Sequence, residues 1–96
     1  MSLLSIIVPC YNEEESIIAF YDEFISVYTS SIIDYNSEIK YELILVNDGS
    51  KDNTLKLLKE LAFKDENVKY ISFSRNFGKE SALYAGLKNS SEIILQ

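Results

Sequence analysis

The sequence has 96 residues, of which 47% are hydrophobic and 25% are charged, so it forms one globular unit at most. Its formal net charge is −6 and it contains no basic run, which argues against nucleic acid as a partner. Histidine is absent and Cys10 is the only cysteine, which excludes Ser-His-Asp and Cys-His nucleophilic sites, the usual zinc ligand sets and an intrachain disulfide. The lone thiol and the lack of an apolar run near the ~20 residues that span a bilayer predict a cytoplasmic location.

The first predicted strand covers residues 4–8, and we expect Pro9 to end it because proline cannot donate a hydrogen bond to a neighbouring strand. Three consecutive glutamates, residues 13–15, are expected to lead into a helix and to complement its positive amino-terminal end. Helical spacing gives this helix a core face made of Ile17, Phe20, Tyr21, Phe24, Ile25 and Tyr28. Residues 29–40 show little periodicity and are predicted to be the end of the helix and a connection.

The central predicted strand is the apolar run at residues 43–46, which does not alternate with polar residues. Such a run is typical of a strand that is covered on both faces, as in a parallel sheet. Asn47, Asp48 and Gly49 then break the pattern as a turn. A second helix follows as far as about residue 64, with Ser50 or Asp52 as its cap and an apolar face made of Leu55, Leu58, Leu61 and Ala62.

The third predicted strand, residues 68–74, alternates more and is expected nearer the edge of the sheet. A third helix at residues 81–88 carries small residues that let it pack closely on the sheet, and Asn89 is its expected end. Residues 92–96 begin a fourth apolar strand, within which the sequence stops. The order β-α-β-α-β-α-β predicts an α/β fold with a Rossmann-like open parallel sheet, of which residues 1–96 are the amino-terminal part.

Ligands of open parallel sheets bind outside the carboxyl ends of the strands, where Asp48 is expected. Its carboxylate can accept hydrogen bonds from a base or a ribose, or approach a metal; alternatively, it only forms an Asx-type turn with its own backbone. The Gly-x-Gly-x-x-Gly fingerprint and the P-loop signature are absent. The first strand also lacks the acidic residues that a receiver-type phosphorylation domain carries at its end.

One motif follows each of the first three strands: Pro-x-Tyr-Asn-Glu at 9–13, Val-Asn-Asp-Gly-Ser at 46–50 and Arg-Asn-Phe-Gly-Lys-Glu at 75–80. In this order they resemble the amino-terminal, nucleotide-binding half of family 2 glycosyltransferases with the GT-A fold, and the resemblance spans residues 4–96. Residues 74–83 further resemble bacterial enzymes that move a hexose from a nucleotide sugar onto a polyprenyl phosphate, the dolichol-phosphate-mannose-synthase-like and bactoprenol glucosyltransferase group.

The resemblance implies a nucleotide-binding site in which Asp48 bonds the base and Gly49 and Ser50 shape the floor. It places Arg75 and Lys79 near the diphosphate or a second phosphate. The implied members of the site are Pro9, Tyr11, Asn12, Glu13, Asp48, Gly49, Ser50, Arg75, Gly78 and Lys79. The alternative for the two cations, Arg75 and Lys79, is that they are solvated and bridge to Glu80 or Asp48. The resemblance places no catalytic residue and no metal ligand within this sequence.

By resemblance, the whole protein is an inverting, metal-dependent glycosyltransferase that moves a hexose from a UDP-linked sugar to a polyprenyl phosphate at the cytoplasmic face of a membrane. Its Mg²⁺ or Mn²⁺ would be held by an Asp-x-Asp motif expected just after Gln96, so we expect the present chain to bind no metal and to be inactive alone. Two alternatives remain open: a cell-wall or polysaccharide acceptor, and a non-catalytic nucleotide-binding or interaction module. We also expect a homo-oligomer, with membrane association only through a part beyond residue 96.

Overall fold

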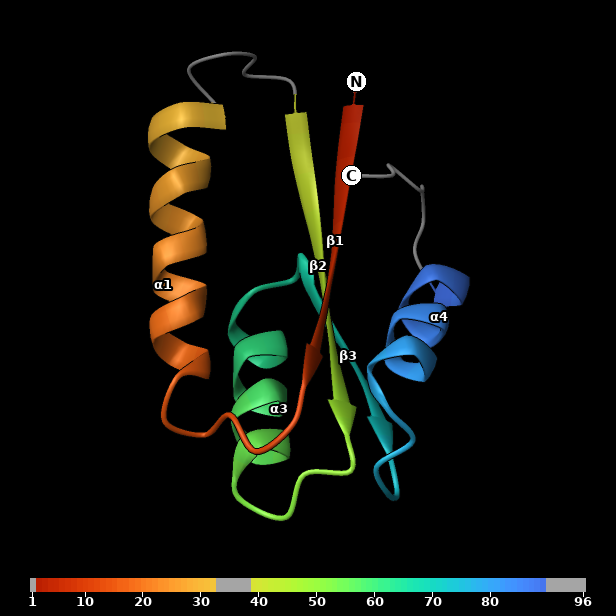
Figure 1. The fold of residues 1–96 in the computed structure, drawn as a ribbon. Coiled ribbons are helices and arrows are strands. Elements are labelled where there is room, and N and C mark those ends of the chain that lie inside the picture. Colours follow the sequence, from red (N-terminus) through yellow and green to blue (C-terminus); the bar gives the residue numbers. More distant parts are fainter. Residues whose placement is uncertain (1, 33–38, 90–96) are drawn as a thin grey trace.

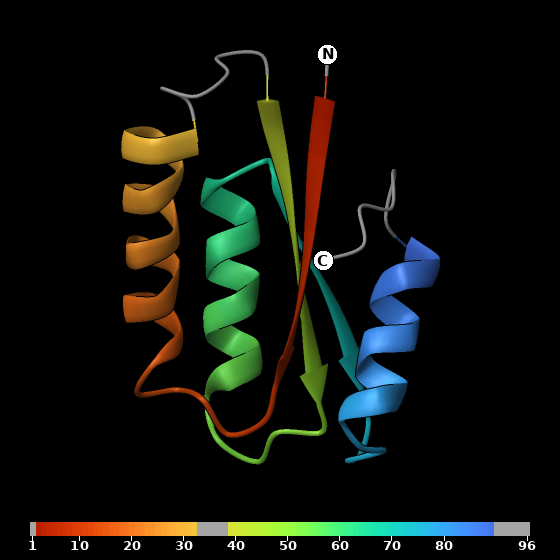
Figure 2. The same ribbon diagram turned by 45° about the horizontal axis from the view of Figure 1, so that its top comes forward.

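The fold is an α/β sandwich around an open parallel sheet, seen in a computed structural model that describes residues 2–32 and 39–89. Three strands lie in the order β1-β2-β3, with bounds Ser2–Cys10, Ile39–Asp48 and Val68–Phe73. Helices α1 (Ile17–Val27) and α3 (Thr54–Lys64) cover one face, and α4 (Lys79–Asn89) lies on the other (Figures 1 and 2). The Rossmann-like α/β class is confirmed. The fourth strand expected at residues 92–96 lies outside the described residues.

Strand β2 is central and buried on both faces, as its uninterrupted apolar run predicts. It pairs in parallel with β1 on one side and with β3 on the other. Every residue from 41 to 48 is buried, with Leu43 and Leu45 facing the α1/α3 side and Ile44 and Val46 facing α4. The strand begins at Ile39, earlier than the apolar run, because polar partners and aromatic neighbours hold its first residues.

Strand β1 passes through Pro9 and ends at Cys10, so the prediction that Pro9 ends the strand is wrong. Pro9 stands in register with Val46 of β2. Within the described sheet β1 has a neighbour on one side only, and every second backbone N–H of such a strand points away from that neighbour. A proline at one of these positions removes no bond from the ladder.

Helix α1 begins at Ile17, just after the three glutamates. Its cap position is Ser16, and the carbonyl of Glu13 accepts the backbone N–H groups of Ser16 and Ile17 in the preceding turn. Residues 13–15 thus lead into the helix as expected, although no acidic residue lies within its first turn. Phe20 is 38% exposed and does not belong to the core, whereas Ile17 and Tyr21 are buried.

A tyrosine pair ties α1 and β2 to the turn between α3 and β3. The hydroxyls of Tyr21 and Tyr41 both donate to Oδ2 of Asp65, the first at 2.6 Å. Burial, the carboxylate hydrogen bond and its charge raise the pKa of Tyr41 to about 12 and shift that of Tyr21 in the same direction. Burial acts to raise the pKa of Asp65, but the tyrosine hydrogen bonds outweigh it and lower that pKa below its usual range.

The two remaining helices are anchored by short polar and apolar contacts. The cap position of α3 is Asn53, so neither of the expected caps, Ser50 and Asp52, occupies it. Asp52, one residue earlier, still holds the first helical residue, because its Oδ1 accepts the backbone N–H of Thr54 at 2.9 Å and the Thr54 hydroxyl at 2.5 Å. Helix α4 starts at Lys79, two residues before the prediction. The expected close packing of α4 is confirmed, since a Cβ added to Gly86 would lie 2.3 Å from Cγ2 of Ile7 in β1.

Candidate functional site

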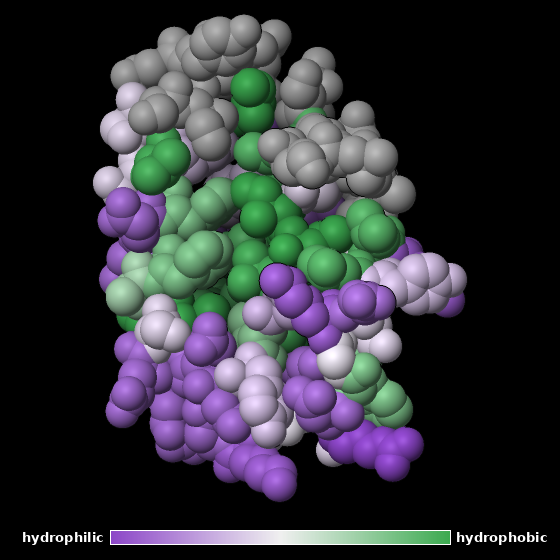
Figure 3. Space-filling model, in the orientation of Figure 1, coloured by the Kyte–Doolittle hydropathy of each residue, from purple (hydrophilic) through white to green (hydrophobic). Residues whose placement is uncertain are grey.

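The loops that leave the three strands meet at one edge of the sheet. Because the strands are parallel, their carboxyl ends point the same way, and Figure 1 shows the three connections gathered at the lower end of the molecule. Hydrophilic side chains collect at this end, below an apolar middle (Figure 3). We call the connections the first loop (residues 11–16), the second loop (residues 49–53) and the third loop (residues 74–78). This edge is where an open parallel sheet binds its ligand.

The first and second loops are joined by reciprocal hydrogen bonds. The backbone N–H of Asn12 donates to Oγ of Ser50 at 3.0 Å, and Oδ1 of Asn12 accepts the backbone N–H of Lys51 at 2.9 Å. The next residue along, Glu13, donates its backbone N–H to Oγ1 of Thr54 at 2.8 Å. Asn12 also takes a left-handed backbone conformation, with φ of 53°, which asparagine tolerates better than most residues. The side chains of Asn12 and Ser50 therefore hold the loops together.

Asp48 joins the second loop to the third. Its Oδ1 accepts the backbone N–H of Phe77 at 2.8 Å and its Oδ2 accepts that of Gly78 at 3.0 Å, while its carbonyl accepts Nδ2 of Asn76 at 3.2 Å. Only 3% of Asp48 is exposed. The Asx-type turn considered for Asp48 belongs to the preceding residue, because Oδ1 of Asn47 accepts the backbone N–H of Ser50 at 3.1 Å.

Gly49 is needed for the close approach of the same two loops. Its φ is +72°, and a Cβ built on it would lie 2.2 Å from the carbonyl carbon of Arg75. A side chain at this position would push the third loop away from the sheet edge. Gly78 also has a positive φ, of +102°, but a Cβ there would meet no atom within 4 Å. Both glycines thus have a positive φ that favours glycine, but only at Gly49 would a side chain also clash with the neighbouring loop.

A pocket of about 480 Å³ opens between the first and third loops, within the range of small-molecule sites. It is lined by Pro9, Cys10, Tyr11, Glu13, Asp48, Asn76, Gly78 and Lys79. The sequence prediction named six of these. Two others, Cys10 and Asn76, were missed although they lie inside the motifs, as the variable position of the first and the second position of the third. Asn12, Gly49, Ser50 and Arg75 were predicted for the site but do not line the pocket.

The charged residues around the pocket differ in what they contact. Arg75 is exposed, and its guanidinium lies 4.9 Å from the ring centre of Phe77. Among residues 2–32 and 39–89, neither Arg75 nor Lys79 forms the bridge to Glu80 or Asp48 that was considered as an alternative. Lys79 lines the pocket from the first turn of α4, where the helix amino terminus adds partial positive charge.

Cys10 is a structural wall of the pocket. Burial, reinforced by the charge of Glu13, raises the pKa of its thiol to about 12. A thiol with such a pKa stays protonated at neutral pH and is a poor nucleophile. It therefore gives the pocket a small apolar surface.

The described residues do not make a metal site. Within them no group of three or more aspartate, glutamate, cysteine or histidine side chains is arranged to hold an ion. Both carboxylate oxygens of Asp48 already accept backbone N–H groups. In the same part of the chain, no helix has the length and apolar character to cross a membrane.

The family model and the similar proteins that the chain matches all point to glycosyltransferases. Residues 5–95 match the family described as Glycosyl transferase family 2. Over 83 residues the chain is 45% identical to "Uncharacterized glycosyltransferase YkcC" of Bacillus subtilis (strain 168), covering 86% of this chain and 24% of that protein. It is 41% identical over 90 residues to "Bactoprenol glucosyl transferase" of Shigella phage SfV, covering 92% of this chain and 27% of that protein. It is also 41% identical over 88 residues to "Prophage bactoprenol glucosyl transferase homolog" of Escherichia coli (strain K12), with the same shares. The chain thus spans about a quarter of the length of these relatives.

Proposed function

Because the chain belongs to glycosyl transferase family 2, we propose that its pocket at the sheet edge binds the nucleoside of a UDP-linked hexose. The whole protein then transfers that hexose to a polyprenyl phosphate at the cytoplasmic face of a membrane. The relatives named bactoprenol glucosyl transferases support this class of acceptor.

The observation that carries the proposal is a pocket lined by the first and third loops and by the carboxyl ends of β1 and β2. Hydrogen bonds join the second loop to the first, and Asp48 at the end of β2 to the third loop. Interlocked loops make a preformed wall, so little ordering would be needed on binding. Tyr11 lines the pocket and is 45% exposed, which leaves a ring face for a base to stack on. The carboxylate of Glu13 can accept hydrogen bonds from a ribose or a base.

The charges that line the pocket favour the nucleoside of the ligand over its diphosphate. The lining side chains include two carboxylates, Glu13 and Asp48, and one ammonium group, Lys79. These residues suit an uncharged nucleoside better than a diphosphate, whose charge needs further cations. Arg75, exposed beside the third loop, is one candidate, and the Asp-x-Asp metal site expected beyond residue 96 is the other. We therefore expect the present chain to recognise mainly the nucleoside and to bind it independently of metal.

Calorimetric titration tests the pocket. The chain is titrated with UDP, UMP and GDP, with and without Mn²⁺, together with Tyr11→Ala and Glu13→Gln. Asp48 is unsuitable as the test position because its replacement also releases the third loop. We expect binding that is selective for uridine and independent of metal. In Tyr11→Ala the affinity should fall at least about tenfold, because the stacking contact with the base is lost.

The matched control is Glu15→Gln, which removes the same charge from an exposed residue outside the pocket and should bind as the parent chain does. Equal binding by the parent and Tyr11→Ala, or no preference for uridine, would refute the assignment of the pocket. The acceptor is tested on the longer protein, by following hexose transfer from UDP-hexose to polyprenyl phosphate. Transfer to a glycan hydroxyl instead would refute that part of the proposal.

A further inference from the structure

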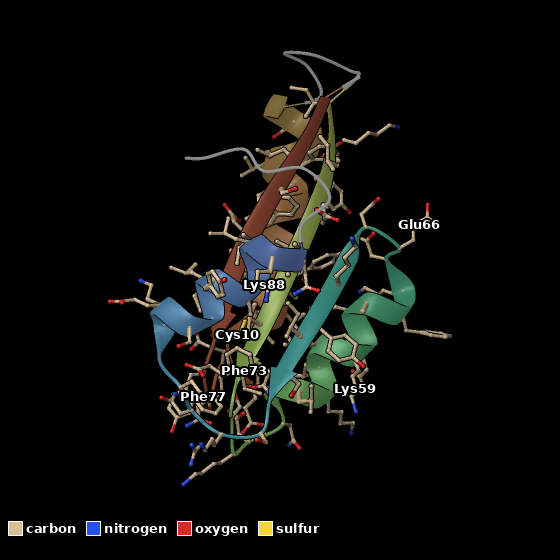
Figure 4. All side chains as sticks on the ribbon, turned by 90° about the vertical axis from the view of Figure 1, so that its right-hand side faces the viewer. Cys10, Lys59, Glu66, Phe73, Phe77 and Lys88 are labelled. Atoms are coloured by element: carbon tan, nitrogen blue, oxygen red, sulfur yellow. The ribbon has the colours of Figure 1, made fainter. Side chains whose placement is uncertain are left out.

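A second concave surface lies on the other side of the third loop, between β3 and α4. It has a volume of about 670 Å³, and its apolar lining comes from Ile71, Phe73, Phe77 and Tyr84. We call it the β3–α4 groove. Figure 4 looks onto this side of the molecule, with Phe73, Phe77 and Lys88 toward the viewer around β3 and α4. The groove is distinct from the proposed nucleotide pocket, because the two share no lining residue.

The groove exists because α4 sits to one side of the sheet. The helix packs mainly on β1 and β2, where Gly86 meets Ile7, and it covers the same face of β3 less completely, so that Ile71 and Phe73 are only partly buried. Two aromatic side chains stand at this opening, Phe77 at 50% exposure and Tyr84 at 64%. Both rings therefore contribute exposed aromatic surface to the same groove.

The charges on α4 indicate what fits the groove. Glu80, Tyr84 and Lys88 follow one another at intervals of four, so they form one stripe along the helix, and all three line the groove. Among the described residues Glu80 has no ion-pair partner, and Nζ of Lys88 lies 5.6 Å from the centre of its own Tyr84 ring. An acid and a base thus stand at equal distances on either side of an exposed aromatic residue.

This stripe is complementary to itself. A second α4, turned by 180° about an axis through Tyr84, brings its Lys88 against Glu80 and its Glu80 against Lys88. Ser81 and Ala85 flank Tyr84 in the groove, and their small side chains let a second helix approach closely. We propose that the β3–α4 groove is a two-fold interface between copies of this chain, in which the α4 helices pack antiparallel and centre on Tyr84.

Sedimentation equilibrium with charge swaps tests the pairing, over concentrations from about 10 µM to about 1 mM, the range in which small interfaces associate. We expect a monomer–dimer equilibrium. Glu80→Lys should weaken the dimer about tenfold or more, because two-fold symmetry replaces two attractions by two repulsions at once. Lys88→Glu should do the same, and the double variant Glu80→Lys/Lys88→Glu should return to within about threefold of the parent.

The controls are Glu66→Lys and Lys59→Glu, which make the same changes in charge on exposed residues outside the groove (Figure 4). Both should dimerise as the parent does, and far-UV circular dichroism verifies that every variant is folded. A monomer at every concentration would overturn the proposal. So would a dimer that Glu80→Lys leaves unchanged, or a double variant that stays as weak as the singles.

Crosslinking tests the geometry separately. With Tyr84→Cys, a short bismaleimide should join two chains, because the new thiols face each other across the axis. Phe63→Cys is the matched control: Phe63 is 94% exposed on α3, and the native Cys10 is buried and does not compete. Crosslinking at residue 63 but not at residue 84 would overturn the interface.

Discussion

Replacing Asp48 by alanine is expected to detach the third loop from the sheet edge. The carboxylate accepts two backbone N–H groups, from Phe77 at 2.8 Å and Gly78 at 3.0 Å, in a position where the residue is 3% exposed. Hydrogen bonds to a charged group contribute about 1.5–3 kcal/mol each. Because Phe77 is half exposed, water can reach the released N–H groups and recover part of this. We expect the free energy of unfolding to fall by about 2–4 kcal/mol.

The variant Asp48→Asn tests the contribution of the negative charge separately from that of the side chain's size and shape. The amide keeps the size of the side chain and one acceptor oxygen, but its NH₂ group would face one of the two backbone N–H donors. One hydrogen bond is kept without its charge assistance, and the other becomes an unfavourable donor–donor contact. The loss should be about 1.5–3 kcal/mol, no larger than that of the alanine variant.

Urea unfolding gives the free energies, and amide hydrogen exchange followed by NMR locates the effect. In Asp48→Ala the backbone N–H groups of Phe77 and Gly78 should exchange about 10-fold or more faster, while those of β2 change only with global stability. Asp22→Ala removes a carboxylate from the exposed surface of α1 and should stay within about 0.5 kcal/mol of the parent. Unchanged exchange at both N–H groups, with a stability loss below about 0.5 kcal/mol, would refute the role of Asp48 as a loop anchor.

Three further predictions concern stability and are measured by urea unfolding. Asp65 has a lowered pKa, so its contribution is complete above the unfolded-state value of about 3.9 and is lost as the pH falls through the folded-state pKa. Asp65→Asn should therefore cost about 1–2 kcal/mol at pH 7, with the difference from the parent closing in acid; a constant difference would contradict this. Gly49→Ala should cost about 2–4 kcal/mol, and Gly78→Ala, which is strained but unhindered, about 1–2; equal losses would contradict the steric argument. Gly86→Ala should cost about 1–3 kcal/mol, and less in an Ile7→Ala background; additive losses would exclude the contact.

The fold could be predicted wherever a residue's surroundings follow from its neighbours in sequence. The four consecutive apolar residues of β2 indicate burial on both faces, and the strand is buried throughout. The small residues of α4 likewise predict its close packing, which Gly86 shows against Ile7. In these cases the layer that covers a strand or helix determines which residues it can carry. The local residue pattern therefore indicates how the element is covered.

The errors occur where the outcome depends on a partner far away in sequence. Pro9 can remain in β1 because the strand has one neighbour within the described sheet, a property of strand order that no local pattern contains. The different hydrogen-bonding roles of Asn47 and Asp48 also depend on a distant partner. Both can form an Asx-type turn, and the choice is made by the third loop, whose N–H groups come to Asp48 from about 30 residues further along the chain.

The motif residues divide into those that line the pocket and those that hold its walls. Tyr11 and Lys79 face the pocket, whereas Asn12, Ser50 and Gly49 keep the loops in contact. Since every loop is held by its neighbour, displacing one would move the pocket wall carried by another. Substitution of a wall-holding residue should therefore weaken ligand binding and loop protection together, whereas substitution of Tyr11, which only lines the pocket, should weaken binding alone. Asp48 does both, because it lines the pocket and also anchors the third loop. Spacing within a motif cannot separate these two groups, because neighbouring residues of one motif can belong to different groups, as Tyr11 and Asn12 do.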